Sequence, residues 1–195
     1  MNYLAHLYLS GKEKELLVGN FIADEVKGRR YESYPVGIRQ GILLHRAIDH
    51  FSDNHPIFNR SKKRLYPVYN HYARVVIDIF YDHFLAKEWN CYSDISLRKF
   101  SFFCYKTLLS YWFHLPRNIK RYLPFIILHR RFVAYSGIEG IRDSLRIMSA
   151  HSSLPDRTDE AISILIGEYE NFREEFHQFF SELVEFCKTR SLNNL

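Results

Sequence analysis

The sequence predicts an all-α fold, a helical bundle formed by a single domain over residues 1–195. Hydrophobic residues make up 47% of the 195 positions and aromatic residues 16%, which is enough to close one core without disulfides or a partner. Only 8 glycines and 6 prolines interrupt the chain, and the long stretches between them lack the alternating pattern of half-buried strands. Helices must therefore account for most of the length.

Local signals indicate where the helices begin. Ser10 and Glu13 have the spacing of a capping box, and Pro35, Pro56 and Pro67 can each occupy the first turn of a helix. Between such signals, apolar residues recur at steps of three and four. The helices are expected at about residues 2–9, 10–26, 35–52, 56–66, 67–89, 95–113, 117–133, 138–149 and 156–188.

The last of these helices has the clearest period in the chain. Its apolar side chains form one stripe, and acidic residues between them form a solvated face. We expect this stripe to pack into the core, although a surface for a partner helix is the alternative. Its members are Ile162, Leu165, Tyr169, Phe172, Phe176, Phe179, Leu183 and Phe186.

Cysteine usage and hydropathy predict a cytoplasmic protein. Cys91, Cys104 and Cys187 are odd in number and lack the paired spacing of a zinc site, which fits a reducing compartment. No basic leader precedes an apolar stretch at the N-terminus, and no run of about 18 apolar residues occurs. A membrane partner is therefore not expected.

Charge is distributed unevenly along the chain. Residues 1–150 carry 23 lysines and arginines against 13 acidic residues, whereas residues 151–195 carry 4 against 9. The net charge of +5 is therefore the sum of a strongly basic segment, residues 1–150, and an acidic C-terminal segment. Such a surface attracts an acidic partner, and charge alone does not choose between nucleic acid, an anionic membrane and an acidic protein.

Four of the first five expected helices carry a polar pair spaced by four residues within apolar sequence. This spacing puts both side chains on one helical face, one turn apart, so that the four helices could direct them at one point. Buried carboxylates are costly unless they are paired or bound to a metal, and histidine with carboxylates suits Mn²⁺, Mg²⁺ or Fe²⁺. The pairs are Asn2 with His6, Asn20 with Asp24, His45 with Asp49, and Asp78 with Asp82.

The alternative for each single pair is purely structural. Asp24 could pair with Arg46, the two histidines could be satisfied core residues, and Asp78 and Asp82 could face solvent. The repeated spacing on successive helices favours a shared metal site instead. Bundled helices are a known way to build such sites from inward-facing side chains.

Residues beside these pairs add phosphate chemistry. The guanidinium of Arg46 could hold a phosphate in a bidentate fork, with a salt bridge to Asp24 or Asp49 as the alternative. His83 or His55 could protonate a leaving oxygen, although His55 could equally stabilise the turn before Pro56. No Gly-rich phosphate loop, nucleophile elbow or zinc-finger spacing occurs, which leaves metal-assisted hydrolysis.

Five segments resemble the acyl carrier protein phosphodiesterase family in order and spacing, mainly within residues 1–90. They are MNYLAHL (1–7), GNFIAD (19–24), GILLHRAID (41–49), DNHP (53–56) and DIFYDHFL (78–85). The resemblance implies a divergent HD-domain phosphohydrolase fold and a divalent metal, usually Mn²⁺, with Mg²⁺ or Fe²⁺ possible. It also implies hydrolysis of holo acyl carrier protein to the apo form and 4′-phosphopantetheine.

The resemblance further implies a ligand set and a mechanism. A metal-activated water would attack the phosphorus, oriented by Asp24 or Asp49, and Asn2, Asn20 and Asp78 would orient the metal ligands. The metal ligands implied are His6, Asp24, His45, Asp49 and Asp82.

The sequence departs from the family pattern at several positions that could contact phosphate or carrier. Tyr8 stands where relatives often have histidine, Ala47 where a second arginine is common, and residues 149–151 where a basic pair is common. These changes concern substrate affinity more than metal binding.

The expected partner is holo acyl carrier protein, an acidic protein, docked on basic patches. These patches are Lys27–Arg30, Arg60–Arg64 and Arg117–Arg121. Two other functions stay open at this point: hydrolysis of a nucleotide or another small phosphodiester, and non-enzymatic binding of nucleic acid. A nucleic-acid partner is not expected, because the sequence has no recognised motif of that class.

Overall fold

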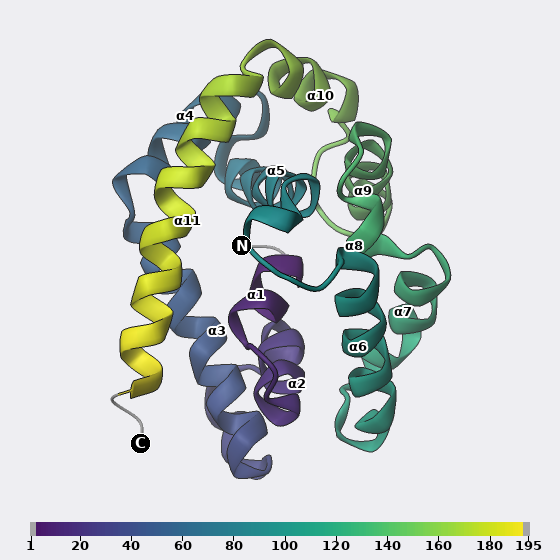
Figure 1. Cartoon of the computed structure of the whole chain (residues 1–195). Helices are drawn as coiled ribbons and strands as arrows, with labels where there is room; N and C mark the ends of the chain where they lie inside the picture. Colours follow the sequence, from purple (N-terminus) through teal and green to yellow (C-terminus); the bar gives the residue numbers. More distant parts are fainter. Residues whose placement is uncertain (1–2, 193–195) are drawn as a thin grey trace.

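The computed structural model describes residues 3–192, and within them the chain is helical with no strand (Figure 1). The predicted all-α fold is therefore confirmed. Its α-helices are α1 (Tyr3–Leu9), α2 (Lys14–Ile22), α3 (Val36–Asn54), α4 (Pro56–Tyr69), α5 (Ala73–Lys87), α6 (Leu97–Ser110), α7 (Arg117–Leu128), α8 (Arg131–Ala134), α9 (Ile138–His151), α10 (Thr158–Gly167) and α11 (Tyr169–Leu192). Its 3₁₀ helices are η1 (Ala23–Glu25), η2 (Gly28–Ser33), η3 (Asn70–Tyr72), η4 (Trp89–Cys91) and η5 (Trp112–His114).

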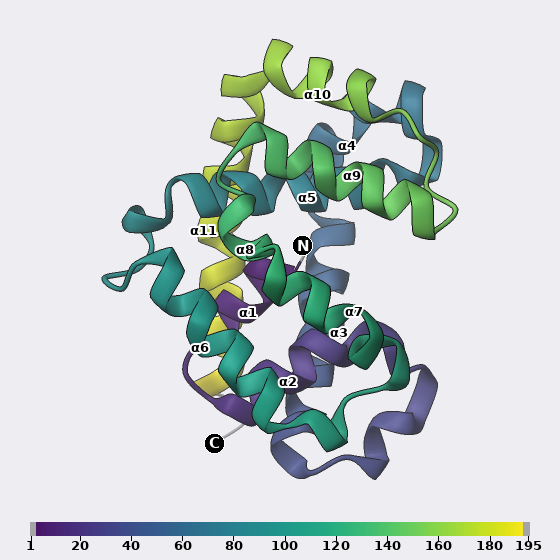
Figure 2. The same cartoon turned by 90° about the vertical axis from the view of Figure 1, so that its right-hand side faces the viewer.

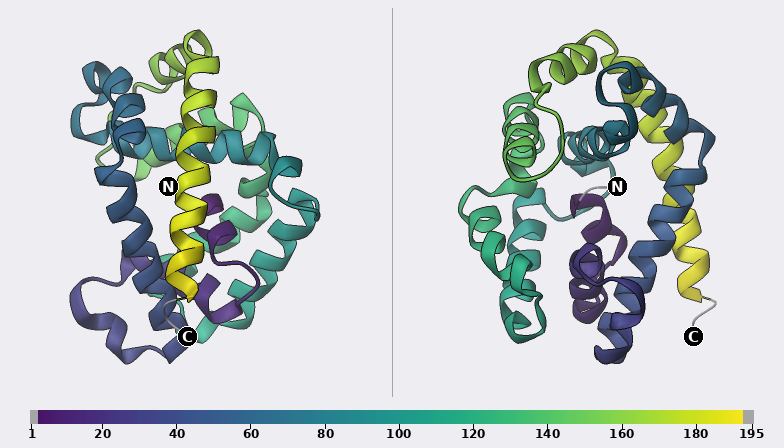
Figure 3. Two further views of the ribbon diagram at one scale, coloured as in Figure 1. Left: turned by 60° about the vertical axis from the view of Figure 1, so that its left-hand side comes forward. Right: turned by 180° about the vertical axis from the view of Figure 1, so that it is seen from behind.

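Helix α5 lies in the middle of the bundle and contacts α1, α4, α9 and α11 (Figures 1 and 3). It is hydrophobic around most of its circumference, with Phe80, Tyr81 and Phe84 completely buried. Helix α11 lies along α3 and α4 on one flank, and α6 and α7 form the opposite flank. A helix enclosed in this way can bury polar side chains only where neighbouring elements supply partners.

Helices α2 and α3 make the most extensive contact in the bundle, and two glycines allow it. A Cβ atom on Gly19 would lie 1.9 Å from the backbone oxygen of Ile38, and one on Gly41 would lie 2.2 Å from that of Leu16. The two backbones therefore touch where no side chain could fit. This close approach places Asn20, next to Gly19, against His45 one turn beyond Gly41.

Two predicted helix starts are wrong. Ser10 does not cap α2, which begins at Lys14 after Glu13 without a side-chain cap; its hydroxyl instead donates to the carbonyl of His6. Pro67 lies inside the last turn of α4 and does not open the next helix, which begins at Ala73. Proline lacks an amide hydrogen, so Pro67 donates no hydrogen bond to the preceding turn of α4.

The expected helices over 117–133 and 156–188 are each two helices. The first is interrupted at Arg130, whose φ of 46° is left-handed, and the second changes direction after Gly167 (Figure 1). The apolar spacing continues across both breaks because each following helix packs on the same core. The prediction that the C-terminal stripe packs inward is confirmed, since Phe172, Phe176 and Phe179 are fully buried. None of the helices in residues 3–192 has the length and apolar character needed to cross a bilayer.

Candidate metal centre

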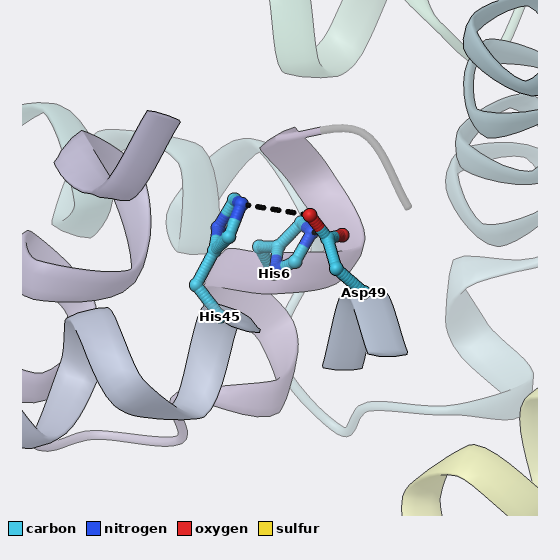
Figure 4. A group of neighbouring side chains, drawn as sticks. All are labelled: His6, His45 and Asp49. Atoms are coloured by element: carbon cyan, nitrogen blue, oxygen red, sulfur yellow. Dashed lines mark ion pairs between the residues drawn. The ribbon is translucent and has the colours of Figure 1, made fainter. Parts of the chain in front are cut away.

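Members of two predicted polar pairs, His6 of α1 and His45 with Asp49 of α3, form one cluster (Figure 4), and Asp24 of η1, from a third pair, contacts it at His45. His6 Nε2 lies 3.6 Å from Asp49 Oδ1, and His45 Nε2 lies 3.4 Å from Asp49 Oδ2. His45 Nε2 is also 3.4 Å from Asp24 Oδ1. The two imidazole rings stack with centroids 4.0 Å apart. Two histidines and one carboxylate thus meet at one point, while Asp24, also expected as a ligand, lies at the edge of this cluster beside His45.

Asn20 fixes the orientation of both histidines. Its side-chain amide donates to the carbonyl of His6 and to Ser10 Oγ, which leaves Oδ1 to accept a hydrogen bond from His6 Nδ1 at 2.8 Å. Its backbone carbonyl accepts from His45 Nδ1 at 2.9 Å. Each ring therefore carries a proton on Nδ1 and presents Nε2 to the carboxylates. Asn20 contacts the histidines as the sequence analysis expected.

The Nε2 atoms of His6 and His45 are buried and make no hydrogen bond within the described residues. An unsatisfied buried nitrogen costs about 1–3 kcal/mol, and two such atoms face the same carboxylates. Ligand atoms of His6, His45 and Asp49 lie within 4.8 Å of one another. A cation bound between them would satisfy both nitrogens and balance the carboxylates, so the residues fit a divalent metal.

The electrostatics of the cluster support the same interpretation. Burial and the positive charge of His45 lower the pKa of His6 to about 4. Burial alone would lower the pKa of His45, but Asp24 and Asp49 outweigh it and raise that pKa to about 9. The neighbouring His45 lowers the pKa of Asp24; burial raises the pKa of Asp49, but the two histidines outweigh burial and hold that pKa well below its usual value. A proton on His45 thus occupies the position of a metal cation.

Asp82, expected as a metal ligand, has a different role in the structure. It is fully buried and does not belong to the cluster of candidate ligand atoms. Its Oδ2 accepts a hydrogen bond from the amide of Leu4 at 2.8 Å, and its Oδ1 accepts one from the amide of Ala5 at 3.1 Å. These amides belong to the first turn of α1, where donors have no partner within the helix. Asp82 therefore caps α1 and holds the helix that carries His6.

The other members of the predicted pairs lie around the cluster. Asn2 lies outside the described residues. Asp78 is half-buried, and burial raises its pKa, against which the positive charge of Arg74 acts. It does not belong to the cluster of candidate ligand atoms in the described part of the chain.

Arg46 does not form the predicted open phosphate fork. Its Nη2 donates to the backbone carbonyls of Val26 and Gly28, each at 2.8 Å, and its guanidinium lies 5.0 Å from the centre of the Tyr31 ring. No ion pair joins it to Asp24 or Asp49 in the described residues, so the alternative is not observed either. Arg46 instead holds the segment that follows Asp24.

His83 and His55, expected as proton donors, point into other parts of the molecule. His83 is fully buried, with Nδ1 2.8 Å from the Tyr135 carbonyl oxygen and Nε2 2.8 Å from the Tyr169 hydroxyl. His55 lies between Phe51 and Phe179, and its Nε2 is 3.1 Å from a carboxylate oxygen of Glu182. Both are core histidines with partners on the C-terminal half of the chain.

Three further polar side chains, which were not predicted from the sequence, lie near the cluster. Arg74 Nη2 lies 3.2 Å from Asp49 Oδ1, and its Nη1 lies 2.9 Å from Asp53 Oδ2. The hydroxyls of Tyr3 and Tyr122 are 3.1 Å apart and interact electrostatically with Asp24. Arg74 precedes Asp78 by four residues, so the spacing rule would have found it had it been applied to arginine.

Comparison with known proteins identifies the family of the chain. A model of the acyl carrier protein phosphodiesterase family matches residues 1–183. The chain belongs to this family.

Three curated members of the acyl carrier protein phosphodiesterase family illustrate the similarity. Proteins of that name from Escherichia coli O6:K15:H31 (strain 536 / UPEC), Enterobacter sp. (strain 638) and Escherichia coli (strain K12 / DH10B) are 28%, 26% and 26% identical to the chain. Each alignment covers 98% of this chain and 100% of the relative. No solved structure matches the chain. Family membership makes the protein an enzyme of the hydrolase class.

One departure from the family pattern has a clear structural setting. The Tyr8 hydroxyl donates to the carbonyl of Tyr92 at 2.9 Å, and its ring packs on Trp89 and Phe180. It therefore fixes α1 to the segment that follows α5 and takes no part in the candidate metal cluster. A phosphodiesterase with tyrosine at this position keeps its candidate metal ligands undisturbed.

Proposed function

We propose that this protein is a metal-dependent phosphodiesterase that hydrolyses holo acyl carrier protein to the apo form and 4′-phosphopantetheine. One observation carries the metal dependence: the buried Nε2 atoms of His6 and His45 make no hydrogen bond within the described residues, and they face the carboxylates of Asp49 and Asp24 at 3.4–3.6 Å. The carrier substrate is supported by the family to which the chain belongs. Mn²⁺ is the metal that we expect, with Mg²⁺ and Fe²⁺ as alternatives.

His6, His45 and Asp49 would hold the ion, and Asp24 would complete the set from the open side. A divalent ion bound there would supply an activated water and offset the negative charge of the phosphodiester. Asp24 suits the orientation of this water because its side chain is 69% exposed while one oxygen reaches His45. Arg74 holds Asp49 from behind and adds a fixed positive charge beside the phosphate.

In the reaction, water oxygen bonds to phosphorus and the bond between phosphorus and the carrier serine oxygen breaks. The released serine oxygen then takes a proton. The two tyrosine hydroxyls near Asp24 replace His83 and His55 as candidate donors. Burial raises the pKa of Tyr122 to about 12 and also raises the pKa of Tyr3 well above its usual value, so both keep their protons at neutral pH. Each hydroxyl could donate a hydrogen bond to a phosphate oxygen or to the leaving oxygen.

The proposed function also includes a fold family and a location in the cell. The helical fold with a His and Asp metal cluster suits a divergent relative of the HD-domain phosphohydrolases. A cytoplasmic location suits a protein with three free cysteines whose substrate takes part in fatty acid synthesis.

Mass spectrometry of holo carrier protein tests the proposed function. The purified enzyme with Mn²⁺ should convert holo carrier to apo carrier and release phosphopantetheine, and removal of metal by a chelator should abolish the conversion. Adding Mn²⁺ back should restore it, whereas adding Ca²⁺ as a matched divalent control should restore little. Full activity after chelation would exclude a metal mechanism. If the carrier is unchanged and a nucleotide or another small phosphodiester is hydrolysed, the same site acts on a different substrate.

A further inference from the structure

Helices α6, α7 and α8 lie in a long segment without negative charge. Residues 95–138 contain eight lysines and arginines and no aspartate or glutamate. All 22 acidic residues of the protein lie outside this segment. The helices form one flank of the bundle and face the viewer in Figure 2. Opposite charge must therefore come from elsewhere in the fold or from another molecule.

The cations of this flank are not neutralised by the rest of the described chain. Arg98, Lys99 and Lys106 on α6 and Arg117 and Arg121 on α7 are exposed, and none forms an ion pair within residues 3–192. The other two basic patches are neutralised in part, through their arginines at positions 29, 60 and 64. Arg64 pairs with Glu175 and Glu168, Arg60 lies 4.0 Å from Glu175, and Arg29 pairs with Glu32.

The same flank exposes large apolar side chains beside its cations. Phe102, Leu109, Phe125 and Leu128 lie on the outer faces of α6 and α7, and Phe113 in the connection between them is 91% exposed. On α7, Arg117, Arg121, Phe125 and Leu128 follow one another at helical steps of four, four and three, which places them on a single stripe. Exposed aromatic and aliphatic groups among unpaired cations are typical of an interaction surface.

A shallow groove joins the two helices on this flank. It is lined by Arg98, Lys99 and Phe102 from α6 and by Ile127, Arg130 and Val133 from the end of α7 and from α8. Its walls combine three positive charges with apolar side chains. A helix that carries acidic residues along an apolar ridge would match both properties.

Helix α7 also borders the metal centre. The Asn118 amide donates to Glu25 at 2.8 Å, next to Asp24, and the Tyr122 hydroxyl lies 3.1 Å from that of Tyr3. Arg117 and Arg121 directly precede these two residues in sequence. A macromolecule bound along α7 would therefore lie beside the candidate ligands, within reach of a prosthetic group attached to its surface.

From these observations we infer that the outer faces of α6 and α7 are the docking surface for the acidic carrier protein. This inference rests on the proposed function. Arg117 and Arg121 bind acidic side chains of the carrier, and Phe102 with Leu128 covers an apolar ridge between them. The patch at Arg60–Arg64 takes no part, because it lies on α4, on the flank opposite α6 and α7 (Figure 1), and its two arginines pair with Glu175 of α11 and with Glu168 just before that helix.

Charge reversal at two matched pairs of residues tests this assignment. The variant Arg117→Glu/Arg121→Glu changes the docking surface, and Lys62→Glu/Lys63→Glu on α4 changes charge by the same amount, at lysines without an ion pair in the described part of the chain. Binding of fluorescent apo carrier is measured by anisotropy, and KM and kcat are measured on holo carrier. The α7 variant should raise Kd and KM at least about fivefold at low salt with little change in kcat, and the α4 variant should change neither. Phe102→Ser should weaken binding without altering its salt dependence.

The readouts separate this inference from the proposed function. If the wild-type enzyme releases no phosphopantetheine, the proposed function fails, while carrier binding by anisotropy still reports on the surface. If the enzyme is active and both double variants weaken carrier binding equally, or neither does, the docking assignment is overturned. Loss of binding to phosphatidylglycerol vesicles or to DNA in the α7 variant, with carrier binding unchanged, would also overturn it in favour of that partner.

Discussion

Replacing Asp82 with alanine separates its two possible roles. As a cap, Asp82 accepts hydrogen bonds from the amides of Leu4 and Ala5 at 2.8 and 3.1 Å in a fully buried setting. Asp82→Ala leaves both amides without a partner, and each unsatisfied buried donor costs about 1–3 kcal/mol. The sum of about 2–6 kcal/mol is reduced because the variant no longer buries a carboxylate. We expect a net loss of about 2–4 kcal/mol in the free energy of unfolding at pH 5.

The loss of stability caused by Asp82→Ala should become smaller as the pH rises. Burial raises the pKa of Asp82 from 3.8 to about 7, so ionisation of Asp82 opposes folding. The stability that this group contributes is present below about pH 4 and is lost as the pH rises through about 7. Each pKa unit corresponds to about 1.4 kcal/mol. The free energy of unfolding of the wild-type protein should therefore fall by at most about 4 kcal/mol as the pH rises. Since the variant lacks this decline, the difference between the proteins should be smaller at pH 8 than at pH 5.

Urea unfolding of both proteins at pH 5 and pH 8, together with Mn²⁺ binding, checks this reasoning. Asp82→Asn serves as the matched variant for metal binding, because the amide keeps the shape and one acceptor of the carboxylate. The structure predicts reduced stability and an unchanged stoichiometry of Mn²⁺ in the folded variant. A stable Asp82→Asn protein that binds no Mn²⁺ would refute the capping role and restore Asp82 as a ligand.

The remaining predictions concern the cluster and its neighbours. Mn²⁺ binding at pH 7 should release about one proton, because His45 has a pKa of about 9 and must lose its proton to coordinate the metal. Calorimetry in buffers of different ionisation enthalpy measures the number of protons released, and binding without proton release would contradict the role of His45 as a ligand. Asp49→Ala should lower phosphopantetheine release at least about 100-fold while the protein stays folded by circular dichroism, and near-normal turnover would remove Asp49 from the site. His83→Ala should cost about 2–3 kcal/mol of stability with activity per folded molecule retained; a large fall in kcat at normal stability would make His83 a proton donor after all.

Sequence spacing predicted that His6, His45 and Asp49 would lie close together, because residues four apart share one face of a helix. Residues four apart share a face, so His45 and Asp49 had to point the same way, and the pairs containing His6 and Asp24 met them. Spacing cannot predict what a face will meet in the folded protein. The face that contains Asp82 meets the first turn of α1, which only the packing of α1 on α5 determines.

Adjacency in sequence to a candidate ligand did not predict which other side chains lie at the cluster. Arg46 follows His45 and His83 follows Asp82, but neighbouring residues on a helix point about 100° apart. Arg46 accordingly reaches the loop at Val26, and His83 reaches Tyr135. Helix breaks at Arg130 and Gly167 escaped prediction for a related reason: apolar periodicity continues when the next helix packs on the same core.

An anomalous difference map from crystals grown with Mn²⁺, collected at the manganese edge, tests the central claim most directly. The structure predicts one peak within coordination distance of His6 Nε2, His45 Nε2 and an oxygen of Asp49, with Asp24 on its open side. Crystals of the His6→Ala variant provide the control and should lack this peak. A map without a peak between these residues, or with manganese bound only elsewhere, would contradict the account.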